Sequence, residues 1–332
     1  MIGVIGCGSW GTALAAVLAR NAPQQQQLIW GRDQQVIDDI NNNHLNSKFT
    51  KDVKLPINLK GTSDLSALIA NSRDLLICIP SKAFIELLCD LQPHIQASHR
   101  ICWATKGLEK NTGRFLHQVV LEMFPLCHVG IISGPSFADE VVKNLPTAVS
   151  VASNNKQFLY DLIINFQQDT FRLYPTHDLL GVQLGGVMKN IFAVAAGVGD
   201  GLGFGANARA ALLTRALVEM QRLADKIGAQ PETMSGLAGL GDLILTCTDN
   251  KSRNRRFGLC LAEGMLLEQA ESSVGVVEAV NNVQEVFKIA QALEIDMPIT
   301  FAVYDLLQGN ITSLQAAHRL LSRKSLISEL LS

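Results

Sequence analysis

Short apolar runs alternate with amphipathic stretches along the first half of the chain. The runs are continuous and end at Gly, Pro, Ser or Lys, which is typical of strands buried on both faces. They cover residues 2–6, 27–30, 74–80, 100–105, 128–133 and 147–153. Helical periodicity separates several of them, for example over residues 10–20 and 82–91. This alternation predicts parallel strands joined by right-handed helical crossovers.

The pattern changes after residues 171–181, where Ala-, Leu- and Gly-rich segments of helical period begin and continue to the end of the sequence. A chain of 332 residues is also too long for one core of ordinary size. We therefore expect an α/β domain with a parallel sheet over residues 1–178, followed by an all-α domain over residues 179–332.

Composition narrows the class of protein. Apolar residues make up 48% and charged residues 17% of the chain, with no apolar run long enough to span a bilayer and no cleavable leader. We therefore expect a cytoplasmic protein without a membrane span. The formal net charge of −2 argues against a nucleic-acid partner. The seven cysteines are scattered without ligand spacing, which favours reduced thiols and no metal site.

Three glycines lie between the first predicted strand and the first predicted helix. Residues 6–11 read GCGSWG and match the spacing G-x-G-x-x-G. In this motif Gly6 permits a tight turn, Gly8 lets a pyrophosphate approach the main chain, and Gly11 lets the helix pack closely on the sheet. The helix start then offers free N–H groups to the phosphates. A glycine-rich turn without a ligand is the alternative, and the placement between strand and helix favours a dinucleotide site.

The second predicted strand ends beside a basic residue. At the corresponding position of dinucleotide sites, an acid binds the ribose 2′-hydroxyl and an arginine accepts a 2′-phosphate. Arg32 comes first and Asp33 follows it. We therefore expect NADPH to be favoured, with NADH still possible. A solvated loop arginine is the alternative.

Ligands of open parallel sheets bind beyond the carboxyl ends of the strands. Three turns at such ends are unusual, namely CIPS (78–81), ATKGLE (104–109) and SGPSFADE (133–140). The second turn carries Lys106 at its tip, where a surface lysine and a ligand-binding lysine both fit the position. The third could present backbone N–H groups and the Ser136 hydroxyl to a ligand.

A second lysine interrupts a strongly apolar helical segment, residues 181–203. Lys189 shares one helix face with small residues three, four and seven positions away, which are Gly185, Gly186, Ala193 and Ala196. So flat a face allows another surface or a flat cofactor ring to lie against it, at a cost of about 1 kcal/mol of helix propensity per glycine. The alternative is a lysine that reaches solvent along its stem.

An acid and a basic helix start form a third candidate constellation. Asp242 interrupts an apolar run, which is costly unless its carboxylate finds a partner. Residues 252–256 read SRNRR and begin a helix that Asn250 or Ser252 could cap. Helix-start N–H groups, a capping hydroxyl and arginines suit a phosphate monoester. A solvated basic face is the alternative.

Nine segments, taken in chain order, carry a resemblance to one family: GCGSWGTALA, WGR, IPS, ATKGLE, SGPSFADEV, GGVMKN, GLAGLGDLILTCT, SRNRRFG and VVEAV. They resemble bacterial NAD(P)-dependent glycerol-3-phosphate dehydrogenase over nearly the whole chain. The resemblance implies a Rossmann-type domain, a helical domain and an active site in the cleft between them. It also implies a cytoplasmic homodimer that interconverts dihydroxyacetone phosphate and sn-glycerol 3-phosphate by hydride transfer and supplies the phospholipid backbone.

The resemblance further implies roles for individual residues. The cofactor, NADPH or NADH, would contact Gly6, Gly8, Ser9, Trp10, Gly11, Arg32, Lys106, Ala138, Arg253, Val276 and Glu278. The substrate would contact Lys106, Gly134, Ser136, Lys189, Asp242, Ser252, Arg253 and Asn254. Lys189 would be the catalytic acid and base. Two residues depart from the usual pattern, Gln183 in place of Glu and Met188 in place of Leu, and Gln183 could alter an ionic support behind Lys189.

Two other functions stay open. A dehydrogenase of the same architecture could act on a hydroxy acid, as the 3-hydroxyisobutyrate and 6-phosphogluconate types do, although the SRNRR segment counts against the first type. A regulator could instead bind NADPH without turnover. Such a protein would not need Lys189 and Asp242 in an apolar domain.

Overall fold

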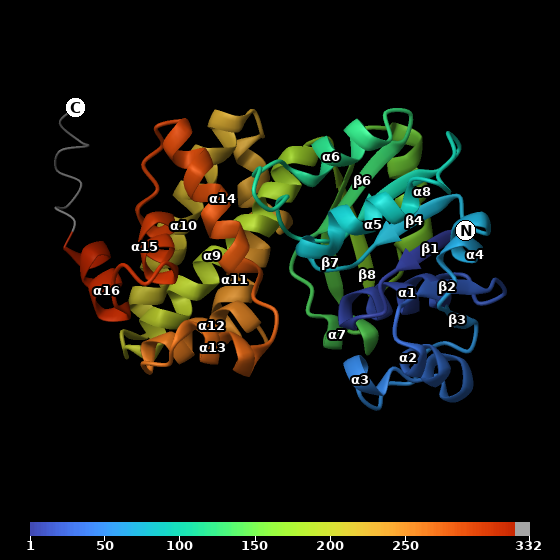
Figure 1. The fold of residues 1–332 in the computed structure, drawn as a ribbon, viewed down its shortest axis with the longest axis horizontal. Coiled ribbons are helices and arrows are strands. Elements are labelled where there is room, and N and C mark those ends of the chain that lie inside the picture. Colours follow the sequence, from blue (N-terminus) through green and yellow to red (C-terminus); the bar gives the residue numbers. More distant parts are fainter. Residues whose placement is uncertain (323–332) are drawn as a thin grey trace.

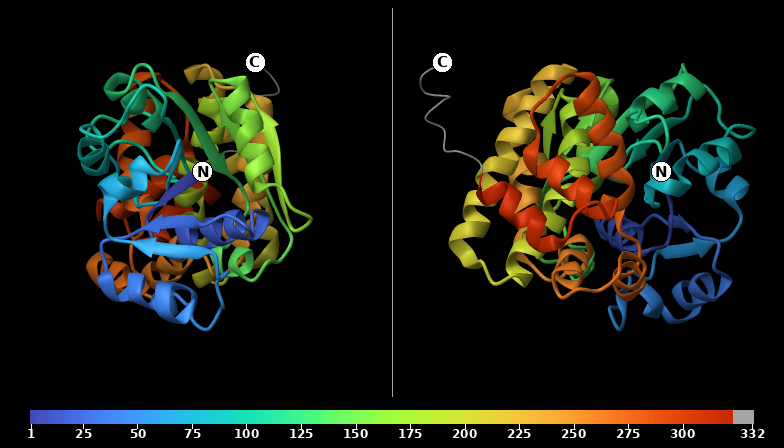
Figure 2. Two further views of the ribbon diagram at one scale, coloured as in Figure 1. Left: turned by 90° about the vertical axis from the view of Figure 1, so that its right-hand side faces the viewer. Right: turned by 60° about the vertical axis from the view of Figure 1, so that its left-hand side comes forward.

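A computed structural model describes residues 1–322, and residues 323–332 of the expected helical domain lie outside the described part. The first half of the chain builds a sheet with helices on its faces, and the second half builds a bundle of helices beside it (Figure 1). In the right-hand view of Figure 2 the yellow-to-red helices of the bundle lie to the left and the blue-to-cyan elements at the start of the chain lie to the right. The predicted fold class, an α/β domain followed by an all-α domain, is confirmed.

Eight strands form one sheet in the order β3-β2-β1-β4-β5-β6-β7-β8. Their bounds are β1 Ile2–Ile5, β2 Gln27–Trp30, β3 Leu59–Thr62, β4 Asp74–Ile77, β5 Arg100–Trp103, β6 His128–Ser133, β7 Thr147–Ser153 and β8 Phe171–Thr176. Each of the six predicted runs contains one of these strands. The boundary expected after residue 178 falls between β8 and the next helix, and the division into two folding units stays a prediction.

The helices of the sheet half are α1 Ser9–Asn21, α2 Gln34–Asp38, η1 Asp39–Asn43, α3 Ser47–Thr50, α4 Leu65–Ala70, η2 Ser81–Ala83, α5 Phe84–Leu91, α6 Leu116–Met123, α7 Ala138–Val142 and α8 Lys156–Phe166. Those of the bundle are α9 Leu179–Gly201, α10 Gly205–Ile227, η3 Pro231–Ser235, η4 Leu237–Gly241, α11 Asp242–Thr248, α12 Arg253–Ala262, α13 Leu267–Val274, α14 Glu278–Ala292, α15 Pro298–Leu307 and α16 Ser313–Leu321.

The sheet departs from the prediction at β7, which runs antiparallel to β6 with Ser133 opposite Ser150. The other neighbouring strands pair in parallel. A parallel crossover usually carries a full helix across the sheet, whereas the connection here holds only the five-residue helix α7. The prediction of uniformly parallel strands is therefore wrong at this position, because an apolar run does not encode its own direction.

A search of the sequence for continuous apolar runs does not find the two edge strands, β3 and β8. β3 reads LKGT and buries only Leu59, while β8 alternates buried and exposed residues from Phe171 onward. An edge strand has neighbouring structure on one side only, so a continuous apolar run is not required.

Helices cover both faces of the sheet. Side chains of α1 and α8 pack on one face, and those of α4, α5 and α6 pack on the other. Phe158 on α8 and Phe84 on α5 are fully buried. The sheet is therefore buried on both faces, as its apolar strands require.

The long helix α9 forms the centre of the bundle. Within residues 1–322 it is the helix long and apolar enough to cross a membrane, yet 78% of its most apolar window is buried inside the protein. Its apolar character therefore reflects its place in the core, where it packs against α10, α11, α12 and α14.

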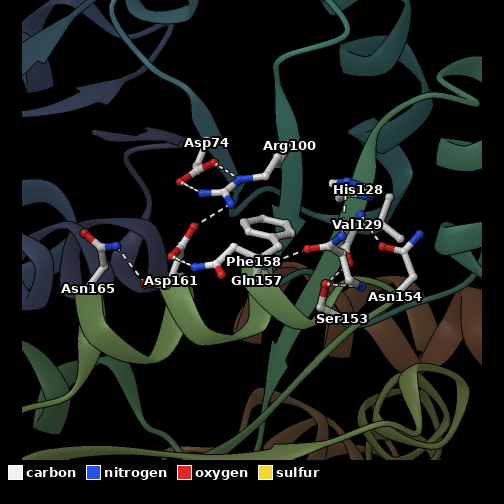
Figure 3. Close-up of polar contacts among 11 residues, drawn as sticks. Asp74, Arg100, His128, Val129, Ser153, Asn154, Gln157, Phe158, Asp161 and Asn165 are labelled. Atoms are coloured by element: carbon white, nitrogen blue, oxygen red, sulfur yellow. Dashed lines mark hydrogen bonds and ion pairs between the residues drawn. The ribbon is translucent and has the colours of Figure 1, made fainter.

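A buried ion cluster ties β4, β5 and α8 together (Figure 3). Arg100 donates hydrogen bonds to both carboxylate oxygens of Asp74, at 2.5 and 2.7 Å, and to Asp161 at 2.6 Å. Its guanidinium carbon lies 4.5 Å from the centroid of the Phe158 ring. The Arg100 and Asp74 side chains are only 5% and 7% exposed, so each charge depends on the other.

Replacing Arg100 with Met should destabilise the protein strongly, because it leaves the Asp74 carboxylate buried without its main partner. We expect the free energy of unfolding, measured by urea denaturation, to fall by about 3–5 kcal/mol. Arg319→Met is the control, because its ion pair with Asp305 is more exposed and such pairs contribute about 0–1 kcal/mol. Equal losses in the two variants would contradict the buried-anchor role of Arg100.

Candidate active site

The glycine turn after β1 has the geometry that its sequence predicts. Gly6 has a φ of +114°, a conformation that side chains disfavour. A Cβ at Gly11 would lie 1.8 Å from the Gly6 carbonyl oxygen. Only glycine at both positions lets α1 approach the turn this closely.

Gly8 differs from its two neighbours in the motif because the space in front of it is open. A Cβ there would meet no heavy atom within 4 Å. Gly8 is the N-cap of α1, and no side chain caps this helix start. Backbone N–H groups at a helix start bind phosphate oxygens. The turn can therefore hold a pyrophosphate, with Ser9 and Trp10 in the first helical turn beside it.

Arg32 and Asp33 occupy different environments after β2. The Arg32 side chain is 73% exposed, lies 3.9 Å from the Glu86 carboxylate, and borders a cavity of about 150 Å³ that the glycine turn also lines. Asp33 accepts a hydrogen bond from the Gln35 N–H and pairs with Lys48 at 2.7 Å. Arg32 is therefore accessible to a ligand, while Asp33 is engaged within the protein.

Two lysines share one buried carboxylate between the sheet and the bundle. Asp242, the first residue of α11, is 1% exposed. Its Oδ1 lies 2.7 Å from Nζ of Lys189 on α9, and its Oδ2 lies 2.5 Å from Nζ of Lys106 in the turn after β5. Thr246, one turn further along α11, accepts a hydrogen bond from Lys189 at 3.0 Å and donates one to Asp242 at 3.2 Å. The structure thus joins three predicted site residues in one cluster.

The charges of this cluster are unbalanced. Burial lowers the pKa of the Lys106 ammonium to about 8. The attraction of Asp242 opposes this shift, and the repulsion from Lys189 adds to it. Burial alone would raise the pKa of the Asp242 carboxyl, but the two ammonium groups hold it below its usual value. Two cations around one anion leave a net positive charge at neutral pH, which suits an anionic ligand.

Each ammonium also keeps a donor for a ligand. A lysine ammonium has three N–H donors. Lys189 uses two of them, on Asp242 and Thr246, and Lys106 uses two, on Asp242 and the Gly134 carbonyl. One N–H of each lysine is therefore left to bind an oxygen atom of a substrate.

The turn after β6 lies next to Lys106. The Gly134 carbonyl accepts hydrogen bonds from Lys106 at 3.1 Å and from the Ser136 hydroxyl at 2.9 Å. Lys106, Gly134 and Ser136 therefore lie together beyond the carboxyl ends of β5 and β6, where ligands of parallel sheets bind.

Protein segments cover the flat face of α9 at its glycines. A Cβ at Gly185 would lie 2.1 Å from the Ala238 carbonyl oxygen, and one at Gly186 would lie 3.2 Å from Cγ of Lys106. These glycines bring α9 against η4 and let Lys106 pass the helix toward Asp242. The sequence allowed either another surface or a flat cofactor ring against this face. At both glycines the face contacts another part of the protein.

The start of α12 holds the predicted phosphate-binding residues in unequal positions. Ser252 is the N-cap, and its hydroxyl accepts a backbone N–H of the first turn. Arg253 is exposed, whereas Asn254 is buried. The Asn254 amide donates to Asn190 at 2.9 Å and accepts a backbone N–H at the start of α14 at 3.2 Å. Asn254 thus joins three helices, and its contact with substrate stays a prediction.

The other predicted cofactor residues lie around the same interface. Glu278, the first residue of α14, accepts two hydrogen bonds from Ser81, one from the hydroxyl at 2.6 Å and one from the Ser81 backbone N–H at 3.3 Å. Val276 precedes this helix and is half-buried, and Ala138 begins α7 and packs on the sheet core. Their cofactor contacts stay predictions.

Gln183 lies away from Lys189, and the effect of Gln in place of Glu at this position stays a prediction. Its amide donates to Nδ1 of His117 at 2.8 Å and to the Leu179 carbonyl at 3.0 Å, and it accepts the His117 backbone N–H at 3.2 Å. Its partners therefore lie on α6 and in the first turn of α9, so it gives Lys189 no ionic support. Met188 is buried in the bundle core.

Sequence reasoning gave no individual role to three polar residues of this region: Thr246, Asn190 and Ser81. Thr246 lies four positions after Asp242, and residues at this spacing share a helix face, so a search for polar neighbours of the buried acid would have found it. The contacts of Asn190 with Asn254 and of Ser81 with Glu278 arise only through tertiary packing. Within residues 1–322, no group of three His, Cys, Asp or Glu side chains could hold a metal ion.

Comparison with known proteins places this geometry in a family. The N-terminal model of the NAD-dependent glycerol-3-phosphate dehydrogenases matches residues 1–159, and the C-terminal model matches residues 178–318. The glycerol-3-phosphate dehydrogenase [NAD(P)+] of Alkalilimnicola ehrlichii is 47% identical over 323 residues, with 97% of each chain covered. That of Coxiella burnetii is 47% identical over 323 residues, covering 97% of this chain and 96% of the relative.

Solved structures agree with these matches. The crystal structure of the Coxiella burnetii glycerol-3-phosphate dehydrogenase has a TM-score of 0.92 and 46% identity, with 97% of this chain and 98% of that chain covered. A D-mandelate dehydrogenase with NADH has a TM-score of 0.63 at 11% identity, with 96% of this chain and 99% of that chain covered, and shows the fold alone. The resemblance seen in the sequence and the expected enzyme class, an NAD(P)-dependent oxidoreductase, are therefore confirmed. The chain belongs to the NAD-dependent glycerol-3-phosphate dehydrogenase family.

Proposed function

We propose that this protein interconverts dihydroxyacetone phosphate and sn-glycerol 3-phosphate with NADPH or NADH. The observation that carries this proposal is the pair of lysines around the buried Asp242. The pair offers a net positive charge to an anionic substrate and a proton donor to its carbonyl oxygen. Similar proteins named glycerol-3-phosphate dehydrogenase [NAD(P)+] support the choice of substrate.

The cofactor-binding residues are proposed from the open helix start and the turn after β2. Gly8, Ser9 and Trp10 would hold the pyrophosphate at the start of α1, where no side chain competes for the N–H groups. Arg32 would pair with a 2′-phosphate, which favours NADPH over NADH. When bound, the nicotinamide supplies the hydride for reduction of the carbonyl carbon.

Lys189 is the proposed catalytic acid. Negative charge grows on the substrate oxygen during reduction, and an ammonium beside it stabilises that charge and then donates its proton. Asp242 and Thr246 orient the amine by accepting two of its three N–H groups. In the reverse direction, the neutral amine of Lys189 accepts the hydroxyl proton.

The phosphate end of the substrate is assigned to the start of α12. Ser252 caps this helix, Arg253 is exposed beside it, and the helix N-terminus adds partial positive charge. Lys106, Gly134 and Ser136 would hold the substrate on the sheet side. Binding energy from the non-reacting phosphate would then position the carbonyl for reaction.

The cellular role is proposed from the product. We infer that this protein supplies glycerol 3-phosphate as the backbone for phospholipid synthesis, and that it works as a cytoplasmic homodimer.

Changing Lys189 to Met should lower kcat for dihydroxyacetone phosphate by about 10²-fold or more, because general acid catalysis is lost. The nicotinamide absorbance reports the rate. Lys251→Met is the matched control, since this lysine pairs with Asp139 and Glu140 near the surface and should leave kcat unchanged. Near-normal turnover by the Lys189 variant would refute its role. A wild-type protein that binds NADPH without turnover would instead be a regulator.

Changing Arg253 to Ala should weaken the use of dihydroxyacetone phosphate much more than that of dihydroxyacetone. A hydrogen bond between charged groups contributes about 1.5–3 kcal/mol, or roughly 10- to 150-fold in kcat/KM. Steady-state kinetics with both ketones measures the difference. Equal losses for both ketones would contradict phosphate recognition by Arg253.

Changing Arg32 to Ala should lower the ratio of kcat/KM for NADPH to that for NADH by about tenfold, because only NADPH carries the 2′-phosphate. The assay compares the two cofactors at saturating ketone. An unchanged ratio would mean that Arg32 is a solvated loop residue.

A further inference from the structure

A buried arginine on α12 links three segments of the bundle. Arg255 donates from Nη2 to the Asp200 carboxylate at 2.5 Å and from Nε to the Cys247 carbonyl at 3.1 Å, and Nη1 donates to the Asn250 side chain. These partners lie at the end of α9, in the last turn of α11 and in the loop before α12. One side chain therefore ties the start of α12 to two other helices.

The backbones of α9 and α12 touch directly beside this arginine. A Cβ at Gly197 would lie 2.1 Å from the Arg255 carbonyl oxygen, and one at Gly258 would lie 2.2 Å from the Val194 carbonyl oxygen. At these two glycines the helices meet through their backbones. The close backbone contact leaves no gap between the helices, and two polar links oppose sliding along it: the hydrogen bond from Asn254 to Asn190 near Lys189, and the ionic link from Arg255 to Asp200 at the end of α9.

The same two helices carry the two ends of the proposed substrate site. Lys189 lies on α9, eleven residues before Asp200, a distance of about 16 Å along the helix axis. Ser252 and Arg253 lie at the start of α12, in the turn that Arg255 anchors. A shift of α12 along α9 would therefore change the span between the proton donor and the phosphate-binding residues.

We propose that Arg255 is a positioning residue that, together with the hydrogen bond from Asn254 to Asn190, holds this span and thereby selects a short phosphorylated ketone. The proposal rests on the proposed function. When a substrate must contact two groups at the same time, an error of about 1 Å in the distance between them can lower the rate on the order of 10²-fold. Only a substrate that reaches both Lys189 and the start of α12 is sensitive to the span.

The structure provides a matched control on the same carboxylate. Arg209 on α10 donates from Nη1 to both oxygens of Asp200, at 2.9 and 2.8 Å. It has no hydrogen bond to α12 among the described residues. Arg209→Gln therefore removes one arginine from Asp200 and leaves the Arg255 hydrogen bonds in place, whereas Arg255→Gln removes the link from the start of α12 to Asp200.

The test compares three ligands in each variant. For Arg255→Gln we expect kcat/KM for dihydroxyacetone phosphate to fall by about 10- to 100-fold. The kcat/KM for dihydroxyacetone and the inhibition constant of inorganic phosphate should stay within about threefold of wild type, because neither ligand spans the site. Arg209→Gln should leave all three values unchanged. Arg255→Lys should give an intermediate loss, since an amine keeps the charge opposite Asp200 but cannot reproduce the guanidinium fork.

Two outcomes would overturn the proposal. One is a kcat/KM for dihydroxyacetone phosphate that stays near the wild-type value in Arg255→Gln, or in Arg255→Lys if the first variant does not fold. The other is an equal loss for both ketones and for phosphate, which would indicate general damage to the bundle and would accompany a lowered Tm. Failure of the proposed function is distinguishable, because the wild-type protein would then not turn over dihydroxyacetone phosphate at all.

Discussion

The burial of one carboxylate constrains the rest of this molecule. A carboxylate as buried as that of Asp242 is costly unless opposite charges reach it. Lys106 reaches it from the turn after β5, and Lys189 reaches it from the middle of α9. The sheet and the bundle must therefore keep one relative position for the charge to be compensated. The same arrangement leaves a positive charge that an anionic substrate can balance.

Glycines make this arrangement possible by removing side chains at the points of closest approach. Gly185 brings α9 against η4, and Gly197 brings it against α12. Each glycine inside a helix costs about 1 kcal/mol relative to alanine, and the close packing of the bundle offsets that cost. The helix that carries Lys189 therefore touches both the segment before Asp242 and the helix assigned to phosphate binding. The proposed proton donor, the buried acid and the residues assigned to phosphate binding are thus connected through α9 and its two close backbone contacts.

Much of the fold follows from local physical rules that a sequence displays. The apolar runs and the glycine turn predict the strands and the start of α1, and the capping role of Ser252 follows from its place before a basic helix. A lone Asp242 in an apolar run demands a cation, which makes the lysines natural partners. Local sequence rules do not predict the direction of a strand or contacts between distant parts of the chain. The antiparallel β7 and the edge strands β3 and β8 belong to this second group.

The same division holds for the site. Asn254 carries the polarity expected of a substrate ligand, yet its amide is used between helices, and only the packing of α9, α12 and α14 reveals this. Gln183 pairs with His117, sixty-six residues earlier in the chain, which no local pattern indicates. Arg255 stands between two exposed arginines in one basic segment, and burial alone separates its role from theirs. Side-chain chemistry can be read from the sequence, but which groups are already engaged depends on tertiary structure.

The pH dependence of catalysis tests most directly whether Asp242 holds the two ammonium groups. In the wild-type protein, kcat/KM for dihydroxyacetone phosphate should fall as the pH rises through about 8, because Lys106 then loses the proton that it keeps at lower pH. In Asp242→Asn the attraction that favours the ammonium form is removed, so this decline should move to lower pH by about one unit or more. A decline at the same or a higher pH in the variant would contradict the account.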